Sequence, residues 1–139
     1  IKHFTSAFGE HVIAEEVEFA IQEGLKGFDA QIVEFTVAPQ VNPKQGELPY
    51  HEWFIEFSKK PNDMKAFITK MDLLLQQKNP YYADLLKGNI LQCLKVSIIK
   101  KGGFTSFMKA RGKLGGQNKI PRLSNDRKMA DELIEFVEK

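Results

Sequence analysis

The spacing of apolar side chains changes period along the chain, and each change predicts a boundary between a helix and a strand. Residues 14–26 place apolar side chains on one helical face and glutamates mostly on the other. Residues 31–38 and 50–58 instead alternate apolar and polar positions, as half-buried strands do. Residues 39–49 hold three prolines, an asparagine and a glycine, and predict a long loop between these strands.

The second half of the chain repeats this change of period. Residues 63–77 follow the helical period after Asn62, a candidate cap, and Asn79-Pro80 predicts the start of a further short helix. Residues 91–99, rich in Leu, Ile and Val, predict a strand that is covered on both faces. Two more helices are expected. One carries Phe104, Phe107 and Met108, and the other spans residues 125–138 with Ser124 as its cap and with Ala130, Leu133 and Val137 on its apolar stripe.

With residues 1–8 as an opening strand, the order of elements is β-α-β-β-α-β followed by helices. This order predicts an α+β fold with a split β-α-β-β-α-β sheet of about four strands, flanked by helices and followed by extra C-terminal helices. A length of 139 residues suits one domain, residues 1–139. The expected core residues are Phe35, Trp53, Phe57, Phe67 and Val96.

Composition narrows the class of protein. The chain is 42% hydrophobic and 27% charged, as globular proteins are, and no apolar run reaches the roughly 18 residues of a membrane span. The single cysteine, Cys93, argues against a disulfide scaffold and suits a reducing, cytoplasmic compartment. Because the chain begins at Ile1 on a strand-like pattern, we expect a fragment of a longer protein.

Charge is distributed unevenly along the chain. Residues 85–125 contain no Asp or Glu but nine Lys and Arg, whereas residues 1–84 carry a net −5 and residues 126–139 a net −2. A region of one sign could face a phosphate, a nucleic acid, an acidic membrane surface or an acidic protein. It could equally be neutralised by the acidic parts of the same chain, and charge alone does not separate these interpretations.

One loop inside this basic region has a composition suited to anions. Residues 115–126 combine a double glycine, an amide and a proline with Lys119 and Arg122. Glycine allows close approach of the backbone, proline fixes the local path, and the two cations supply a point charge and a planar bidentate donor. Most loops of this kind are only connectors.

Other candidate chemistry is sparse. His3, His11 and His51 are too scattered for a metal site, so no metal site is predicted, and His51 is interpreted as a structural histidine. The two Gly-Gly pairs lack the spacing of a nucleotide fingerprint. Tyr81-Tyr82 is interpreted as core packing, because the basic stretch lacks the interleaved aromatics of single-strand binders.

Four segments resemble the C-terminal domain of the Gretchen Hagen auxin-responsive promoter family, with a likeness that covers essentially the whole chain and is closest to bacterial members. The specific part is the Lys-x-Pro-Arg motif after a glutamine, within residues 116–123 (Gly-Gln-Asn-Lys-Ile-Pro-Arg-Leu). Three looser segments support it: residues 8–12 (Phe-Gly-Glu-His-Val), 50–57 (Tyr-His-Glu-Trp-Phe-Ile-Glu-Phe) and 102–104 (Gly-Gly-Phe).

The resemblance implies an acyl-acid amido synthetase of the adenylate-forming superfamily. Such enzymes use ATP and Mg²⁺ to adenylate a carboxylic acid and then transfer the acyl group to an amino acid. A large N-terminal domain makes most contacts with nucleotide, Mg²⁺ and acyl acid, and a small C-terminal domain swings over it as a lid. This chain matches only the lid, so its expected partners are that N-terminal domain and the two substrates, with no nucleic acid or membrane, and the fragment alone is expected to be inactive.

The resemblance also implies roles for individual residues. Lys119 matches the lysine of the motif and is the expected catalytic residue, stabilising charge that develops on phosphate. Arg122, Gln117 and His11 are expected to join Lys119 in binding phosphate or nucleotide. Arg122 could equally do no more than tie the loop to the acidic surface of its own domain. His11 stands where plant members usually have a lysine, near the interdomain hinge, and supplies positive charge only when its imidazole is protonated.

Two alternatives remain beside the lid of an amido synthetase. The domain could be a noncatalytic binding module whose basic region docks nucleic acid or an acidic protein. It could also serve an adenylating enzyme that transfers the acyl group to a thiol or another amine. The sequence does not identify the acyl acid, the acceptor or the oligomeric state.

Overall fold

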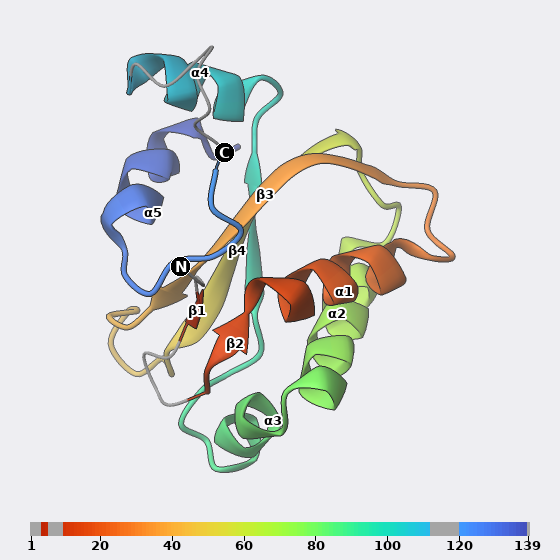
Figure 1. Cartoon of the computed structure of the whole chain (residues 1–139), viewed down its shortest axis with the longest axis vertical. Coiled ribbons are helices and arrows are strands. Elements are labelled where there is room, and N and C mark those ends of the chain that lie inside the picture. The colour runs from red at the N-terminus through yellow and green to blue at the C-terminus, as the bar shows by residue number, and fades with distance from the viewer. Residues whose placement is uncertain (1–3, 6–9, 112–119, 139) are drawn as a thin grey trace.

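A three-stranded sheet forms the centre of the computed structural model, which describes residues 4–5, 10–111 and 120–138 (Figure 1). The strand β3 (Gln31–Gln40) pairs antiparallel with β4 (Tyr50–Lys59), and β4 pairs parallel with β5 (Lys95–Ile99). The predicted α+β class is confirmed. The opening strand differs in detail, because β1 (Phe4–Thr5) forms a separate two-stranded ladder with β2 (Val12–Ile13).

Helices cover both faces of this sheet. On one face, α1 (Ala14–Leu25) packs along α2 (Met64–Lys78), and the short α3 (Pro80–Lys87) follows at the lower end of the view in Figure 1. On the other face lie α4 (Gly103–Ala110) and α5 (Lys128–Leu133), which continues into a 3₁₀ turn, Ile134–Phe136. The central strand is therefore enclosed, and it is buried from His51 to Phe57.

Alternation along β4 divides the interior into two cores, because successive side chains of a strand point to opposite faces. Trp53, Ile55 and Phe57 pack into the core beneath α1 and α2, whereas Phe54 packs into the core beneath α4 and α5. Of the five predicted core residues, four are buried and Trp53 is completely so. Val96 is the exception, since it is only partly buried and lies at the border of the first core.

The predicted strand over residues 91–99 is wrong in its first half. Leu91 and Leu94 are buried, but they are packed into the first core without strand pairing, and β5 begins only at Lys95. The backbone N–H of Leu94 donates to the Asp72 carboxylate, and that of Gln92 donates to the carbonyl of Pro49. Two buried leucines therefore satisfied the sequence pattern without belonging to a strand.

The predicted closing helix is also too long at both ends. The N–H of Ser124 bonds to the carbonyl of Val37 and so belongs to an extended segment, and α5 begins only at Lys128. Val137 lies beyond the helix, where it forms an antiparallel bridge with Ile99. At α2, Asp63 rather than Asn62 is the cap, accepting from the N–H of Ala66.

Within the described ranges, none of the helices combines the length and the apolar character that crossing a membrane requires.

Candidate functional site

Residues 120–124, the described end of the predicted anion-binding loop, run along the outer edge of β3. Leu123 forms a parallel bridge with Val37, whose N–H donates to the carbonyl of Arg122 over 3.0 Å. In return, Val37 accepts from the N–H of Ser124 over 2.8 Å. The hydroxyl of Thr36 donates to the carbonyl of Pro121 over 2.6 Å. We call residues 120–124 the edge segment, and these bonds fix its backbone to the sheet.

Two buried apolar side chains fix the edge segment to the protein interior. Leu123 is fully buried in the core beneath α1 and α2, and Ile120 is buried in the core beneath α4 and α5. The segment therefore crosses from one core to the other around the edge of the sheet. Burial of side chains this size contributes about 1.5–3 kcal/mol each, so the position of the segment does not depend on its charges.

Arg122 is held between a carboxylate and an aromatic ring. Its Nη1 atom donates to Oε1 of Glu34, and its guanidinium carbon lies 4.4 Å from the centre of the Phe35 ring. The same Oε1 atom accepts from the N–H of Phe35 over 3.0 Å. The Arg122 side chain is 37% exposed and that of Glu34 is 27% exposed, so water reaches this pair.

The other predicted phosphate-binding residues are placed only in part. Lys119 and Gln117 lie outside the described residues. His11 is exposed and sits just before β2 with φ of 49°, a left-handed conformation that is uncommon for a residue other than glycine. Of these predicted residues, the described part of the chain thus includes Arg122, beside the edge of β3, and His11, just before the separate ladder.

The residue next to His11 belongs to a buried polar cluster that sequence reasoning did not find. Oε2 of Glu10 lies 2.6 Å from Nε2 of His51, and both side chains are completely buried. Asn79 donates to the carbonyl of Glu10 over 2.9 Å and to Oε1 of Glu16 over 3.1 Å. The interpretation of His51 as a structural histidine is supported by this burial. The pairing joins residues 41 positions apart, so no local pattern could have indicated it.

A second part of this interior is built around Asp72. The hydroxyl of Tyr82 donates to Oδ1 of Asp72 over 2.5 Å, and Gln76 donates to Oδ2 over 2.7 Å. Burial raises the pKa of the Tyr82 hydroxyl well above its ordinary value, and the Asp72 carboxylate raises it further. Tyr82 is fully buried, as predicted, whereas the adjacent Tyr81 is 65% exposed.

On the face of β4 that packs against α4 and α5, two glutamates bond to the residues that begin these helices. Glu56 accepts from the N–H groups of Gly102, over 3.0 Å, and of Phe104, over 3.2 Å. Gly102 has φ of 76°, which glycine adopts without strain. Because the protein's own carboxylate occupies the start of α4, the glycines of the Lys-Lys-Gly-Gly turn form a helix start and not an anion site. Glu52 pairs with Arg127 over 2.7 Å and accepts from Ser97.

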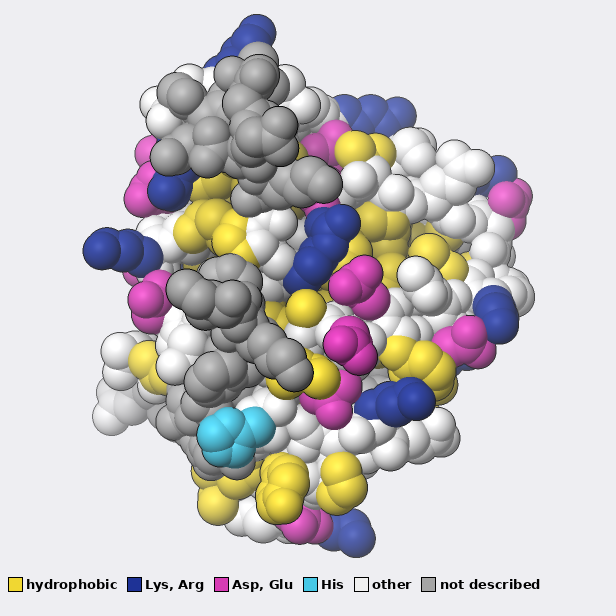
Figure 2. All heavy atoms as spheres, in the orientation of Figure 1, with side chains coloured by type: hydrophobic (Ala, Val, Ile, Leu, Met, Phe, Trp, Pro, Cys, Tyr) yellow, Lys and Arg dark blue, Asp and Glu magenta, His cyan; other side chains and the backbone are white. Residues whose placement is uncertain are grey.

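The basic region is partly neutralised by acids from elsewhere in the chain. Its members Lys95, Arg111 and Arg122 form ion pairs with Glu47, Glu132 and Glu34 respectively. On the face shown in Figure 2, positive and negative side chains are interspersed over the described surface. These pairs support the interpretation in which acidic residues from other parts of the chain neutralise the basic region.

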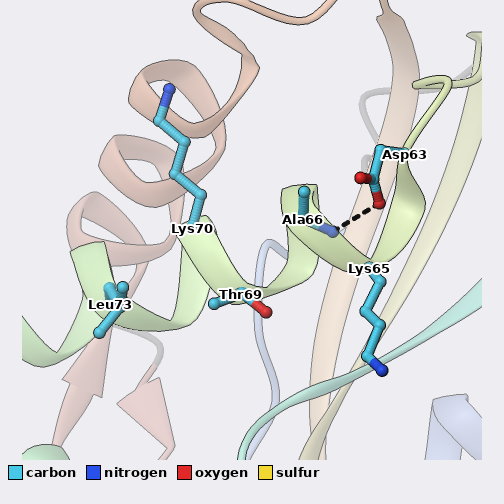
Figure 3. A pocket seen from close by; sticks show the side chains of 6 residues that line it. All are labelled: Asp63, Lys65, Ala66, Thr69, Lys70 and Leu73. Atoms are coloured by element: carbon cyan, nitrogen blue, oxygen red, sulfur yellow. Dashed lines mark hydrogen bonds between the residues drawn. The ribbon is translucent and has the colours of Figure 1, made fainter.

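A shallow hollow of about 500 Å³ lies on the outer side of α2 (Figure 3). All of its lining comes from one stretch of this helix and its cap: Asp63, Lys65, Ala66, Thr69, Lys70 and Leu73. The lysine side chains point in different directions in Figure 3, and Lys70 donates to the carbonyl of Lys26. None of the predicted phosphate-binding residues lines this hollow, so we do not assign it to the site.

Among the described residues, no group of three or more His, Cys, Asp or Glu is arranged to hold a metal ion.

Solved structures share this fold. One titled "GH3.15 acyl acid amido synthetase" superimposes with a TM-score of 0.77 at 16% identity, covering 99% of this chain and 27% of that one. Another, titled "AtGH3.15 acyl acid amido synthetase in complex with 2,4-DB", gives a TM-score of 0.73 at 16% identity, covering 99% of this chain and 26% of that one. No curated protein sequence matches significantly.

The chain thus spans about a quarter of the length of the solved structures that it resembles. The family model described as "GH3 family C-terminal domain" matches residues 15–128, which run from α1 to the first residue of α5 and include the edge segment. This match spans most of the chain. The chain therefore belongs to the GH3 family, the Gretchen Hagen family that its motifs resemble, as a C-terminal domain of that family.

Proposed function

We propose that this chain is the C-terminal lid domain of an ATP-dependent acyl-acid amido synthetase. The observation that carries the proposal is the family match over residues 15–128, together with a whole-chain fold shared with two structures titled as acyl acid amido synthetases. Because those structures are about four times as long, the complete activity would reside in a larger protein. The domain would act with an N-terminal adenylating domain of the same polypeptide.

The proposed reaction has two half-reactions. First, a carboxylate oxygen of the acyl acid attacks the α-phosphorus of ATP and pyrophosphate leaves, which gives an acyl-adenylate. Next, the amine of an amino acid attacks the acyl carbon and AMP leaves, which gives the amide. Negative charge accumulates on phosphate oxygens in the first step. A cation that reaches them only on closure stabilises the transition state more than the ground state.

The proposed contributions of this chain follow from its cations. Lys119 is the proposed catalytic residue, and Gln117, Arg122 and His11 are proposed to bind phosphate or nucleotide with it. Support comes from the edge segment, which begins directly after Lys119 and is bonded to β3 at Pro121 and Arg122. A backbone fixed to a sheet suits Arg122, which lies within this segment, if it must be placed within a fraction of an ångström. A protonated His11 would add positive charge, and a neutral one would add none.

ATP and Mg²⁺ are proposed to be held mainly by the N-terminal domain. When bound, Mg²⁺ would neutralise phosphate charge and orient the leaving pyrophosphate. The C-terminal domain would add cationic side chains from the opposite side. A cytoplasmic location follows from the need for ATP and amino acids, and it belongs to the same proposal.

The competing binding module would use the basic region for nucleic acid or an acidic protein. Three of the nine cations in that region are paired with the protein's own carboxylates, which lowers the net positive charge that the region offers to such a partner. Electrostatic binding to nucleic acid grows with the number of Lys and Arg that neutralise phosphates and so release the counterions condensed on them.

ATP–pyrophosphate exchange tests the proposal. We expect the full-length protein to catalyse exchange in the presence of a suitable carboxylic acid, tested with a panel of aromatic and aliphatic acids. The chain of residues 1–139 alone should show no exchange and should bind ATP with millimolar affinity at best, about −4 kcal/mol. Micromolar ATP binding by this chain, or exchange catalysed without the rest of the protein, would contradict the proposal. Tight binding to duplex DNA or RNA at physiological salt would favour the binding module.

A further inference from the structure

The position of Arg122 does not depend on its carboxylate partner. Its carbonyl accepts from the N–H of Val37, and Pro121 and Ser124 are hydrogen-bonded to β3 as well. Its guanidinium carbon lies 4.4 Å from the centre of the Phe35 ring, a cation–π contact that does not involve the carboxylate. Backbone and ring therefore hold this side chain at the sheet edge.

The contact with Glu34 has the properties of an exchangeable bond. It uses a single nitrogen, Nη1, and a single oxygen, Oε1, although a guanidinium can bind a carboxylate or phosphate through two parallel hydrogen bonds. That oxygen also accepts from the N–H of Phe35, so its capacity is shared between two donors. Both partners are accessible to water, and exposed pairs of this kind add little net stability.

Glu34 has a hydrogen-bond partner at the strand edge besides Arg122. Its carboxylate covers the N–H of Phe35, which lies two residues before Val37 and so on the same side of the strand as the N–H that bonds the edge segment. The carboxylate has this second role in closing the open edge of β3. The Glu34 carboxylate would therefore still have a hydrogen-bond donor if its contact with Arg122 were broken.

We propose that Glu34 is the resident competitor for the anion-binding position at Arg122, and that a phosphate or diphosphate group displaces it. The bound anion would take the bidentate geometry that Glu34 leaves unused, while Arg122 keeps its place over Phe35. The inference rests on the proposed function for the identity of the anion. It adds a regulatory element, because Glu34 would keep Arg122 from binding free phosphate until the correct ligand is brought to it.

Titration of the 139-residue chain with inorganic pyrophosphate tests this inference. The side-chain Nε–H resonance of Arg122 in ¹⁵N-labelled protein reports binding at this residue, measured at low salt. Glu34→Gln keeps the size of the side chain and removes its charge. We expect it to tighten pyrophosphate binding at Arg122 by about fivefold or more, because a negative charge a few ångströms from the ligand is removed.

The protein offers a matched control. Arg111 also pairs with a glutamate, Glu132, and also rests on an aromatic ring, that of Phe107, at 5.3 Å. Glu132→Gln changes the net charge of the chain equally, and we expect the affinity at Arg122 to change by less than about twofold. The double variant Glu34→Gln/Arg122→Gln lacks the reporting resonance, so its pyrophosphate affinity is measured by calorimetry beside that of Glu34→Gln, and it should lose the gain.

The outcomes separate the two proposals. Unchanged or weaker pyrophosphate binding in Glu34→Gln, an equal gain in Glu132→Gln, or no shift of the Arg122 resonance in any variant would overturn the competitor role. Each of these results leaves the lid proposal standing, because that proposal is judged by exchange activity in the full-length protein. An absence of exchange combined with a selective gain in Glu34→Gln would instead support the anion site and refute the lid proposal.

Discussion

Glu10 and His51 form a completely buried pair, with 2.6 Å between Oε2 and Nε2, that ties the segment before β2 to the central strand. The other ring nitrogen of His51, Nδ1, is also buried and has no hydrogen-bond partner among the residues that the structure describes. Each of the two buried side chains is therefore a principal polar partner of the other. Removing one partner should cost far more than replacing both.

We predict that His51→Leu lowers the free energy of unfolding by about 3–5 kcal/mol, because it leaves the Glu10 carboxylate buried without its imidazole. The double variant Glu10→Leu/His51→Leu should lose much less, since two apolar side chains need no partner. Urea denaturation of both variants measures this difference. Asp29→Asn, which removes the exposed pair with Lys59, should have no measurable effect. A double variant at least as unstable as His51→Leu would contradict this account of the pair.

The helices and strands were predictable where a single period persists over many residues. The two long strands and α2 illustrate this, although β4 is buried on both faces from His51 to Phe57 and not on one face, as its alternating pattern predicted. The run from Leu91 to Leu94 could not be distinguished from a strand, since burial and strand pairing select the same apolar side chains. Ser124 has the character of a cap, but the free edge of β3 binds it instead.

The candidate site was proposed from the composition of one loop and from a family motif, and it stays a prediction. Composition indicated an anion-binding loop, and the structure gives Arg122 a place on the sheet edge. Glu34, its partner, comes from a strand 88 residues away, so the pairing arises from tertiary packing. The buried pair of Glu10 and His51 escaped prediction for the same reason.

Tyr82 should make the free energy of unfolding fall as the pH rises above about 10. Burial, and then Asp72, raise the pKa of its hydroxyl, so the folded state keeps a proton that the unfolded chain releases above its ordinary pKa of about 10. This contribution to stability is complete below pH 10 and declines as the pH rises further, by at most about 1.4 kcal/mol per pH unit. We predict that Tyr82→Phe costs about 1–2 kcal/mol at pH 8, through the lost bond to Asp72.

The difference in unfolding free energy between the natural chain and Tyr82→Phe should therefore shrink between pH 10 and pH 11. Chemical denaturation at pH 8, 10 and 11 measures it. Cys93, whose pKa burial also raises, is present in both proteins and largely cancels from the comparison. A difference that stays constant to pH 11 would show that Tyr82 titrates as it does in the unfolded chain.

Gly103 is required for packing at the start of α4. A Cβ atom at this position would lie 2.4 Å from Cγ2 of Ile99, whereas one at Gly88 would meet nothing closer than 3.4 Å. We predict that Gly103→Ala lowers the free energy of unfolding by about 1–3 kcal/mol through overpacking. Gly88→Ala serves as the control and should be close to neutral. Thermal unfolding of the two variants measures the contrast, and equal melting temperatures would refute the packing role.

Lys119→Ala in the full-length protein tests the central claim most directly, with kcat of each half-reaction and the melting temperature measured on the same preparations. Lys101→Ala removes an exposed lysine of the same basic region and is the matched control. Loss of a preorganised donor to a developing oxyanion costs about 2.7–4 kcal/mol. We therefore predict a fall of roughly 10²-fold or more in kcat for one half-reaction in Lys119→Ala, with an unchanged melting temperature and normal turnover in Lys101→Ala. Normal turnover in Lys119→Ala, or a lowered melting temperature with normal turnover in the folded fraction, would contradict the account.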